Sequence, residues 1–389
     1  MTVIGIILFM SRGIVGPINS LYVESLGANY VMIGVLGAMT SLTTIVFSYV
    51  WGRLSDRRGK RKLFLVGGLA ALALSSSLMT VAPDFVYLFP LNILGAAAQA
   101  AYTVVSLALM GDILEQRAGA RGRRMGIYRG LGSLGFGVLA FFSGSIADRL
   151  SLRAPFGLSA GFLVVAVMLA LLVEEDPAHP AREVTSAALV TPQAPAAPLT
   201  SLPLPPLFVS MFLWSLVTGA VYAVWANYMV GELAFTQSQM SRLWGLASFS
   251  EFPLMILAGA LSDRIGRLSM LSLGFFAWTL VFLGYVVTPV MPWIVVVQLV
   301  RAFAYSAFTA ASMTYAAEVR AKAQRGRISG LYSSAGSIGA ILGSTMGGAL
   351  AQFASTPTMI LINAALIFGG AIYLAIVALR HRRYVVAGG

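Results

Sequence analysis

The chain has 389 residues, of which 58% are hydrophobic and only 10% are charged. Soluble globular domains carry about 25% charged residues, so this composition excludes an ordinary soluble enzyme. Twenty-six lysines and arginines against 14 acidic residues give a formal net charge of +12. The absence of cysteine excludes disulfides, thiolate metal sites and a cysteine nucleophile. We predict an all-α integral membrane protein, with no enzymatic activity, no cofactor and no metal site.

Apolar runs that are long enough to cross a membrane recur along the chain. A helix that crosses about 30 Å of hydrocarbon needs roughly 20 apolar residues. The sequence predicts twelve such helices, at 2–23, 29–51, 63–82, 86–111, 124–147, 154–173, 205–230, 238–261, 269–288, 291–317, 327–352 and 357–379.

The composition changes abruptly between the sixth and seventh runs. Residues 174–204 begin with Glu174-Glu175-Asp176-Pro177 and continue as a stretch rich in alanine, proline and threonine. Such a segment buries too little apolar surface to fold, and its prolines favour extended structure. We predict a cytoplasmic linker between an N-terminal six-helix bundle (1–173) and a C-terminal six-helix bundle with a short basic tail (205–389).

Lysine and arginine gather in alternate loops between the runs. The opposite loops hold few of them, with Arg149, Arg153 and Arg242 as exceptions. Because basic loops stay in the cytoplasm, we expect both termini to be cytoplasmic and the protein to lie in the inner (plasma) membrane. The positive charge then reflects topology, so we expect the lipid bilayer as a partner and no nucleic acid.

Two motifs occur once in each half of the chain. The run Gly52-Arg53-Leu54-Ser55-Asp56-Arg57-Arg58-Gly59 closes the second helix, and Gly259-Ala260-Leu261-Ser262-Asp263-Arg264-Ile265-Gly266 closes the eighth, about 207 residues later. Arg121-Gly122-Arg123 opens a glycine-rich fifth helix, and Arg325-Gly326-Arg327 opens a glycine-rich eleventh helix. Both motifs recur after nearly the same number of residues, which indicates that the chain contains two duplicated bundles, related by an axis along the membrane normal.

The loop that closes the second and eighth helices resembles the signature loop of the major facilitator superfamily, and the resemblance covers the whole chain. It implies a transporter, expected to be a monomer, whose halves rock around one central site for a small-molecule substrate. It also implies that Asp56 and Asp263 face the N-termini of the eleventh and fifth helices and latch the cytoplasmic side. The alternative is a purely topogenic signal. The expected gating residues are Gly52, Asp56, Arg57, Gly59, Gly259, Asp263, Arg264 and Gly266.

The glycines of these loops have expected roles of their own. Gly52 and Gly259 would permit close packing of neighbouring helices. Gly59 and Gly266 would permit the tight turn that follows each helix.

Ionisable residues lie inside several of the apolar runs. Arg12, Glu251 and Arg301 are near the middle of the first, eighth and tenth runs, and Asp112 and Glu115 end the fourth. Intramembrane charges are costly unless they are paired or face water, so each is a functional candidate. We expect Glu251 to couple transport to protons, with Asp112 and Glu115 as further candidates, because a carboxyl group in low dielectric suits proton exchange. The alternative is a static Glu–Arg pair.

Polar and aromatic residues on the helices that line the cavity in the superfamily are the candidates for substrate contact. Each has an alternative interpretation as an interfacial anchor or an interhelical contact. The predicted cavity residues are Arg12, Asn19, Gln99, Tyr102, Tyr222, Trp225, Asn227, Gln298, Arg301 and Tyr305.

Short matches indicate the branch of the superfamily. Glu251-Phe252-Pro253 resembles the eighth helix of sugar efflux transporters and of their aryl-acid and sugar-uptake relatives. The drug/proton antiporter branch usually has an arginine where this chain has Leu91, and a Gly-Pro pair that 130–144 lacks. The resemblance implies proton-coupled export of a sugar or a drug-like compound by alternating access. The alternatives are proton-coupled uptake of a sugar or an aromatic acid, and a non-transporting membrane receptor or lipid-handling protein.

Overall fold

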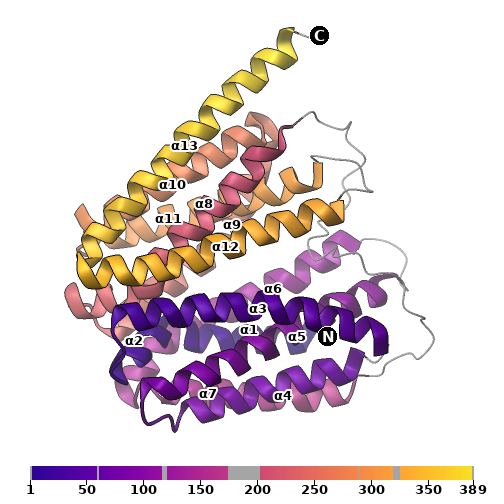
Figure 1. Cartoon of the computed structure of the whole chain (residues 1–389), viewed down its shortest axis with the longest axis vertical. Helices are drawn as coiled ribbons and strands as arrows, with labels where there is room; N and C mark the ends of the chain where they lie inside the picture. The colour runs from indigo at the N-terminus through magenta and orange to yellow at the C-terminus, as the bar shows by residue number, and fades with distance from the viewer. Residues whose placement is uncertain are drawn as a thin grey trace. The chain divides into compact units, whose positions relative to one another are not determined.

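The computed structural model describes residues 2–58, 61–115, 121–173, 202–287, 289–318 and 325–387, and within these ranges the chain is helical throughout apart from short turns (Figure 1). Eleven helical spans in the described ranges are long and apolar enough to cross a membrane. The remaining long helix, α12 (Arg325–Phe353), corresponds to the eleventh predicted helix. It has 29 residues and a length of about 43 Å, and its many glycines lower its hydropathy. The predicted all-α membrane fold is confirmed.

The described helices form two compact units. The first unit comprises Met1–Ala188 and Trp225–Gly245. A 3₁₀ turn at Gly16–Ile18, which contains Pro17, interrupts its first span. A second 3₁₀ turn, Phe85–Tyr87, precedes α5. The helices of this unit run side by side in Figure 1: α1 (Thr2–Val15), α2 (Asn19–Ser25), α3 (Tyr30–Arg58), α4 (Arg61–Met79), α5 (Leu88–Glu115), α6 (Arg121–Arg149) and α7 (Ala154–Leu171).

The second unit comprises Leu189–Val224 and Leu246–Gly389. The stretch Trp225–Gly245 clusters with the first unit, although our sequence interpretation places it in the C-terminal bundle; the division into bundles stays a prediction. Residues 174–201, most of the predicted linker, lie outside the described residues. The helices of this half are α8 (Leu204–Asn227), which continues as a π-helix (Tyr228–Glu232), α9 (Gln237–Ile265), α10 (Arg267–Val287), α11 (Trp293–Glu318), α12 and α13 (Thr356–Ala387).

Helix α1 is central to the packing of the first unit. It packs along α6 and α7, while α4 packs along α5 and α7, and α3 along α5. An apolar cluster joins α1, α4, α5 and α7, and its buried members include Ile4, Leu8, Phe64, Leu65, Leu69, Tyr102, Val105 and Leu163. Lipid tails are as apolar as these side chains, so packing contacts rather than hydrophobic burial hold the helices together.

Glycines bring α1 and α6 into backbone contact. A Cβ atom on Gly13 would lie 2.9 Å from the carbonyl carbon of Phe136, which is closer than real Cβ atoms approach. On α6, a Cβ on Gly132 would lie 2.8 Å from the ring of Phe9 on α1. The glycine-rich motif of the fifth helix therefore serves its packing against the first helix.

The same device joins the corresponding helices of the second unit. A Cβ on Gly343 of α12 would lie 2.8 Å from the carbonyl carbon of Leu216 on α8, and one on Gly347 would lie 2.5 Å from Cα of Ala220. The repeat seen in the sequence thus corresponds to a repeated mode of helix packing. Elsewhere in this unit, α10 packs along both α11 and α13, and Figure 1 shows α13 running along α10.

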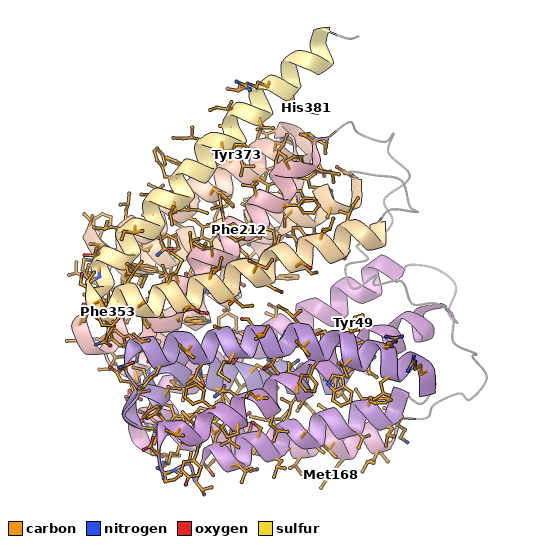
Figure 2. The ribbon with its side chains drawn as sticks, in the orientation of Figure 1. Tyr49, Met168, Phe212, Phe353, Tyr373 and His381 are labelled. Carbon is orange, nitrogen blue, oxygen red and sulfur yellow. The ribbon has the colours of Figure 1, made fainter. Side chains whose placement is uncertain are left out.

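Large apolar side chains remain exposed on the outer faces of the helices. Tyr49 on α3 is 69% exposed, Met168 on α7 is 61% exposed and Phe353 at the end of α12 is 83% exposed (Figure 2). Extended apolar surface of this kind marks contact with a membrane or a partner. In a protein with eleven membrane-length apolar spans among its described residues, the surrounding phase is lipid.

Several helices are longer than the apolar runs that predicted them. The run 29–51 corresponds to Tyr30–Arg58, and the run 357–379 corresponds to Thr356–Ala387. Hydropathy detects the part of a helix that lies in hydrocarbon. A helix continues into the aqueous layer wherever its polar residues are compatible with helical structure, so the helix ends required the structure.

Candidate functional site

An ion pair lies inside the second unit, far from the ends of two long helices. Glu251 is halfway along α9, and Arg301 is about a third of the way along α11. Nη2 of Arg301 lies 3.7 Å from Oε1 of Glu251, and the two side chains are only 8% and 13% exposed. The sequence analysis gave a Glu–Arg pair as the alternative to a coupling role for Glu251, and the structure contains such a pair within this unit.

Neutral groups hold the guanidinium of Arg301 on its other sides. Its Nη1 donates to Oε1 of Gln298 at 3.2 Å, from one turn earlier on α11. Its Cζ lies 5.3 Å from the ring centroid of Tyr222, a cation–π contact. The Tyr222 hydroxyl lies 3.4 Å from that of Tyr285, to which Nε2 of Gln298 donates at 3.4 Å. Residues of α8, α10 and α11 thus surround one cation.

The backbone hydrogen bonding of α9 is irregular around Glu251. Pro253 lies inside α9, and an interior proline removes one backbone hydrogen bond of the helix. The hydroxyl of Ser306 on α11 donates to the carbonyl oxygen of Glu251 at 3.1 Å. These features place Glu251 at an irregular point of α9 that is tied to α11 by both its side chain and its backbone.

Glu251 is not the only partner of Arg301. A charge buried in low dielectric is costly once its partner is removed. Arg301 also contacts the oxygen of Gln298 and the ring of Tyr222, and neither of these contacts involves the carboxylate. The 3.7 Å separation also lacks the tight two-point geometry of the strongest Arg–carboxylate pairs.

Arg12 lies near the centre of the first span, in the first unit. Its side chain is exposed and interacts electrostatically with Tyr102 of α5. Neighbouring residues of α1 face other helices, with Gly13 against α6 and Leu8 in the cluster that contains Tyr102. Among the side chains that the structure describes, no carboxylate forms an ion pair with Arg12.

Other predicted cavity residues of the first unit make local or buried contacts. Asn19 is half-buried and follows the 3₁₀ turn. Nε2 of Gln99 donates to Thr103 of its own helix at 3.1 Å. Trp225 is fully buried and packs edge-on against Trp244, with ring centroids 5.3 Å apart.

Asn227 and Tyr305 also belong to contacts between helices. Asn227 is fully buried, and its Nδ2 donates to the backbone oxygen of Ser20 at 3.1 Å and to Oε2 of Glu24 at 2.6 Å. Tyr305, one turn after Arg301, lies 6.1 Å from the ring of Trp214. Trp225 and Asn227 are inaccessible here, so they fit the alternative of interhelical contacts.

The predicted gating loop of the first half is described only in part. Gly59 lies outside the described residues, as does the side chain of Asp56, and Arg57 is exposed. A Cβ on Gly52 would meet Val104 at an ordinary 3.7 Å, and a Cβ on Gly259 in the second half would meet no atom within 4 Å. The expectation of close packing at Gly52 and Gly259 is therefore wrong; the tight helix contacts lie at other glycines, among them those of α1, α6 and α12.

The loop of the second half forms a charge cluster within its own unit. Asp263 pairs with Arg267, whose guanidinium also donates to Glu318 at the end of α11 through Nη2 at 2.9 Å and Nε at 3.2 Å. Arg264 is exposed. Gly266 has φ +91°, in the left-handed region that favours glycine, and makes the turn between α9 and α10.

Two groups of residues complete the comparison with the sequence. Asp112 and Glu115 lie on α5, and their side chains are outside the described residues. The sequence analysis missed Tyr285. This residue lies on α10, which corresponds to the ninth predicted helix, and that helix was not expected to line the cavity or to flank it. The sequence analysis also missed the pairing of Arg267 with Glu318, although an arginine at one helix start and a glutamate at the end of the next helix is a detectable signal.

Comparisons with known proteins identify the family. The profile described as "MFS_1 like family" matches residues 2–361. The chain is 25% identical over 393 residues to "Multidrug resistance protein MdtG" of Escherichia coli, covering 95% of this chain and 91% of that protein. It is 24% identical over 293 residues to "Multi-drug resistance efflux pump PmrA" of Streptococcus pneumoniae, covering 70% and 68% of the two chains.

Solved structures share the fold. The nucleoside transporter NupG (D323A mutant) matches with a TM-score of 0.80 and 14% identity, covering 97% of this chain and 98% of that one. A bacterial homologue of the human lysosomal transporter Spinster, in an inward-facing and occupied conformation, matches with a TM-score of 0.68 and 14% identity, covering 98% and 94%. With its helical architecture and a family profile that spans nearly the whole chain, this multi-pass membrane protein belongs to the MFS_1-like family of major facilitator transporters.

Proposed function

We propose that the protein is a secondary active transporter that exports a small organic solute in exchange for protons. The solute is a sugar or a drug-like compound, and transport proceeds by alternating access. The chain resides in the inner (plasma) membrane as a monomer, with both termini in the cytoplasm. The names of its relatives, multidrug resistance protein and multi-drug resistance efflux pump, support the outward direction and the class of solute.

The single observation that most supports the proposal of proton coupling is the ion pair between Glu251 and Arg301. Ionisable side chains in the middle of membrane spans are rare and usually mark transport pathways or proton relays. A pair kept only for structure needs no alternative support for its cation. Here Gln298 and Tyr222 hold Arg301 independently of the carboxylate. This support allows Glu251 to take up and release a proton in each cycle while the surrounding helices stay assembled.

The experiment is pH-gradient-driven flux in proteoliposomes. Purified protein is reconstituted, a pH gradient is imposed, and flux is followed for sugars, aromatic acids and cationic dyes. Glu251→Gln keeps the size of the side chain but cannot ionise, so it cannot release a proton. We expect it to abolish the response to the pH gradient while solute binding and solute–solute exchange persist.

A matched control makes the result specific. Glu232 is exposed at the end of the π-helix that follows α8, so Glu232→Gln removes the same charge at the edge of a span and should leave the flux unchanged. A Glu251→Gln protein that still concentrates solute against its gradient under the pH gradient would show that another group couples the proton. Solute accumulation on the opposite side would establish uptake instead of export.

A further inference from the structure

One intramembrane charge is left without a balancing partner in the proposed mechanism. Among the side chains that the structure describes, three of the types that carry a charge at neutral pH lie more than about two helical turns from both ends of their span: Arg12, Glu251 and Arg301. Glu251 and Arg301 pair with each other. Arg12 makes no ion pair with any described carboxylate, so the interior of the described spans carries an excess of positive charge at Arg12.

The position of Arg12 shows that its charge opens onto accessible space. On α1, Gly13 and Phe9 contact α6, and Leu8 enters the apolar cluster shared with α4, α5 and α7. Arg12 lies one turn after Leu8 and Phe9, and its side chain is exposed. An arginine at this depth requires either a counter-charge or water, and its exposure fits a water-filled path.

The neighbouring Tyr102 adds a polar group at the same place. Its ring is buried in the apolar cluster, and the residue lies within electrostatic range of Arg12. The packing of the apolar cluster positions the phenol, which is both a donor and an acceptor of hydrogen bonds. Because Tyr102 is only 3% exposed, the guanidinium of Arg12 is the group that offers several donors to one oxyanion.

We infer that Arg12 binds a negatively charged group of the solute, a carboxylate or a phosphate-type oxyanion. The inference rests on the proposed transport function and names its substrate class. The planar guanidinium matches such groups with two parallel hydrogen bonds. Since no described carboxylate balances it, the same charge repels a cationic solute, so the site selects acids over amines.

The test uses matched probes that differ by one charge. The pairs are 2-naphthoate with 2-naphthamide, and glucuronate with glucuronamide, and affinities for the purified protein are measured in a lipid-free maltoside detergent, which excludes phospholipid phosphates as the ligand. We expect at least one carboxylate to bind about tenfold or more tightly than its amide, the effect of one charge-assisted hydrogen bond. Equal affinities in both pairs overturn the inference.

Variants assign the preference to the residue. Arg12→Gln should remove the difference between carboxylate and amide, and Arg12→Lys should retain part of it because the charge remains. Arg149 is exposed at the end of α6, so Arg149→Gln removes one positive charge at the edge of the span and should keep the full preference. A carboxylate preference that survives Arg12→Gln contradicts the assignment.

The inference and the proposed function fail separately. Glu251→Gln should bind the carboxylate probes as the wild type does while losing pH-gradient-driven flux. If the wild type uses the pH gradient to move neutral or cationic solutes and binds no carboxylate preferentially, proton-coupled export stands and the substrate class is wrong. If the carboxylate preference is present but no solute responds to the pH gradient, Arg12 keeps its role and the coupling proposal is wrong.

Discussion

The contact between α1 and α6 leaves no room for a single methyl group at Gly13. A Cβ there would lie 2.9 Å from both the carbonyl carbon and the Cα of Phe136, whereas ordinary contact begins at 3.4 Å. Gly13→Ala must therefore push the two backbones apart by at least about half an ångström. Overpacking of this kind costs about 1–3 kcal/mol, and the better helix propensity of alanine recovers up to about 1 kcal/mol.

We accordingly expect Gly13→Ala to lower the free energy of unfolding by about 1–2 kcal/mol. The assay is unfolding by SDS in mixed micelles, followed by tryptophan fluorescence. Gly161 on α7 is the matched control, because a Cβ there would meet no atom within 4 Å, so Gly161→Ala should be neutral or stabilising. Equal stability of the wild type and Gly13→Ala would refute the close packing derived for α1 and α6.

Two further predictions concern charged groups at helix ends. Arg267 donates to Glu318 at 2.9 and 3.2 Å. Arg267→Gln leaves that carboxylate without its partner and should lower the free energy of unfolding by about 1–3 kcal/mol. Arg267→Lys should restore little of this stability because lysine cannot bind a carboxylate at two points. Restoration of full stability by lysine, measured by SDS-induced unfolding, would contradict this two-point pairing. Asp148 accepts a hydrogen bond from the backbone N–H of Ser238, in the first turn of α9, at 3.0 Å. Asp148→Ala removes this cap, and the loss of a cap costs about 1 kcal/mol. Asp148→Ala should therefore lower the thermal unfolding midpoint more than Ser238→Ala, which keeps the backbone donor. A larger effect of Ser238→Ala would show that the hydroxyl contact matters more than the cap.

The first turn of α9 has a second cap that a sequence pattern reveals. Thr236 and Gln239 are three residues apart, and each side chain accepts from the backbone N–H of the other, at 3.1 and 2.9 Å. This is a capping box, which a threonine followed three residues later by glutamine predicts. The start of α9 was therefore predictable from the sequence alone, and the expected start at 238 was one residue from the observed Gln237.

Most of the fold could be predicted because the membrane imposes a simple rule on composition. Spans of about 20 apolar residues must be helical in lipid, where backbone groups have no other partner. The interruption at Gly16–Ile18 and the π-helix at Tyr228–Glu232 do not change the average hydropathy. Such local irregularities depend on tertiary contacts, and the sequence alone did not define them.

The site was predictable at the level of residues that are costly in lipid. Glu251 and Arg301 stand out because of their charge, and Gln298 and Arg301 share a helix face since they are three residues apart. Tyr285 gave no such signal, because tyrosines are common at many positions of membrane helices and only packing brings this hydroxyl to within 3.4 Å of Tyr222 and Gln298. Neutral partners of a buried charge are generally found only from three-dimensional contacts.

The glycine contacts restrict the motions that are open to this transporter. Sliding or rolling of α1 against α6 would drive backbone atoms into one another, since no side chain separates Gly13 from Phe136. The same holds for α8 and α12 at Leu216 and Gly343. Each of these helix pairs therefore moves as one stiff element, and deformation during the transport cycle must be taken up elsewhere, for example at the proline of α9 beside Glu251.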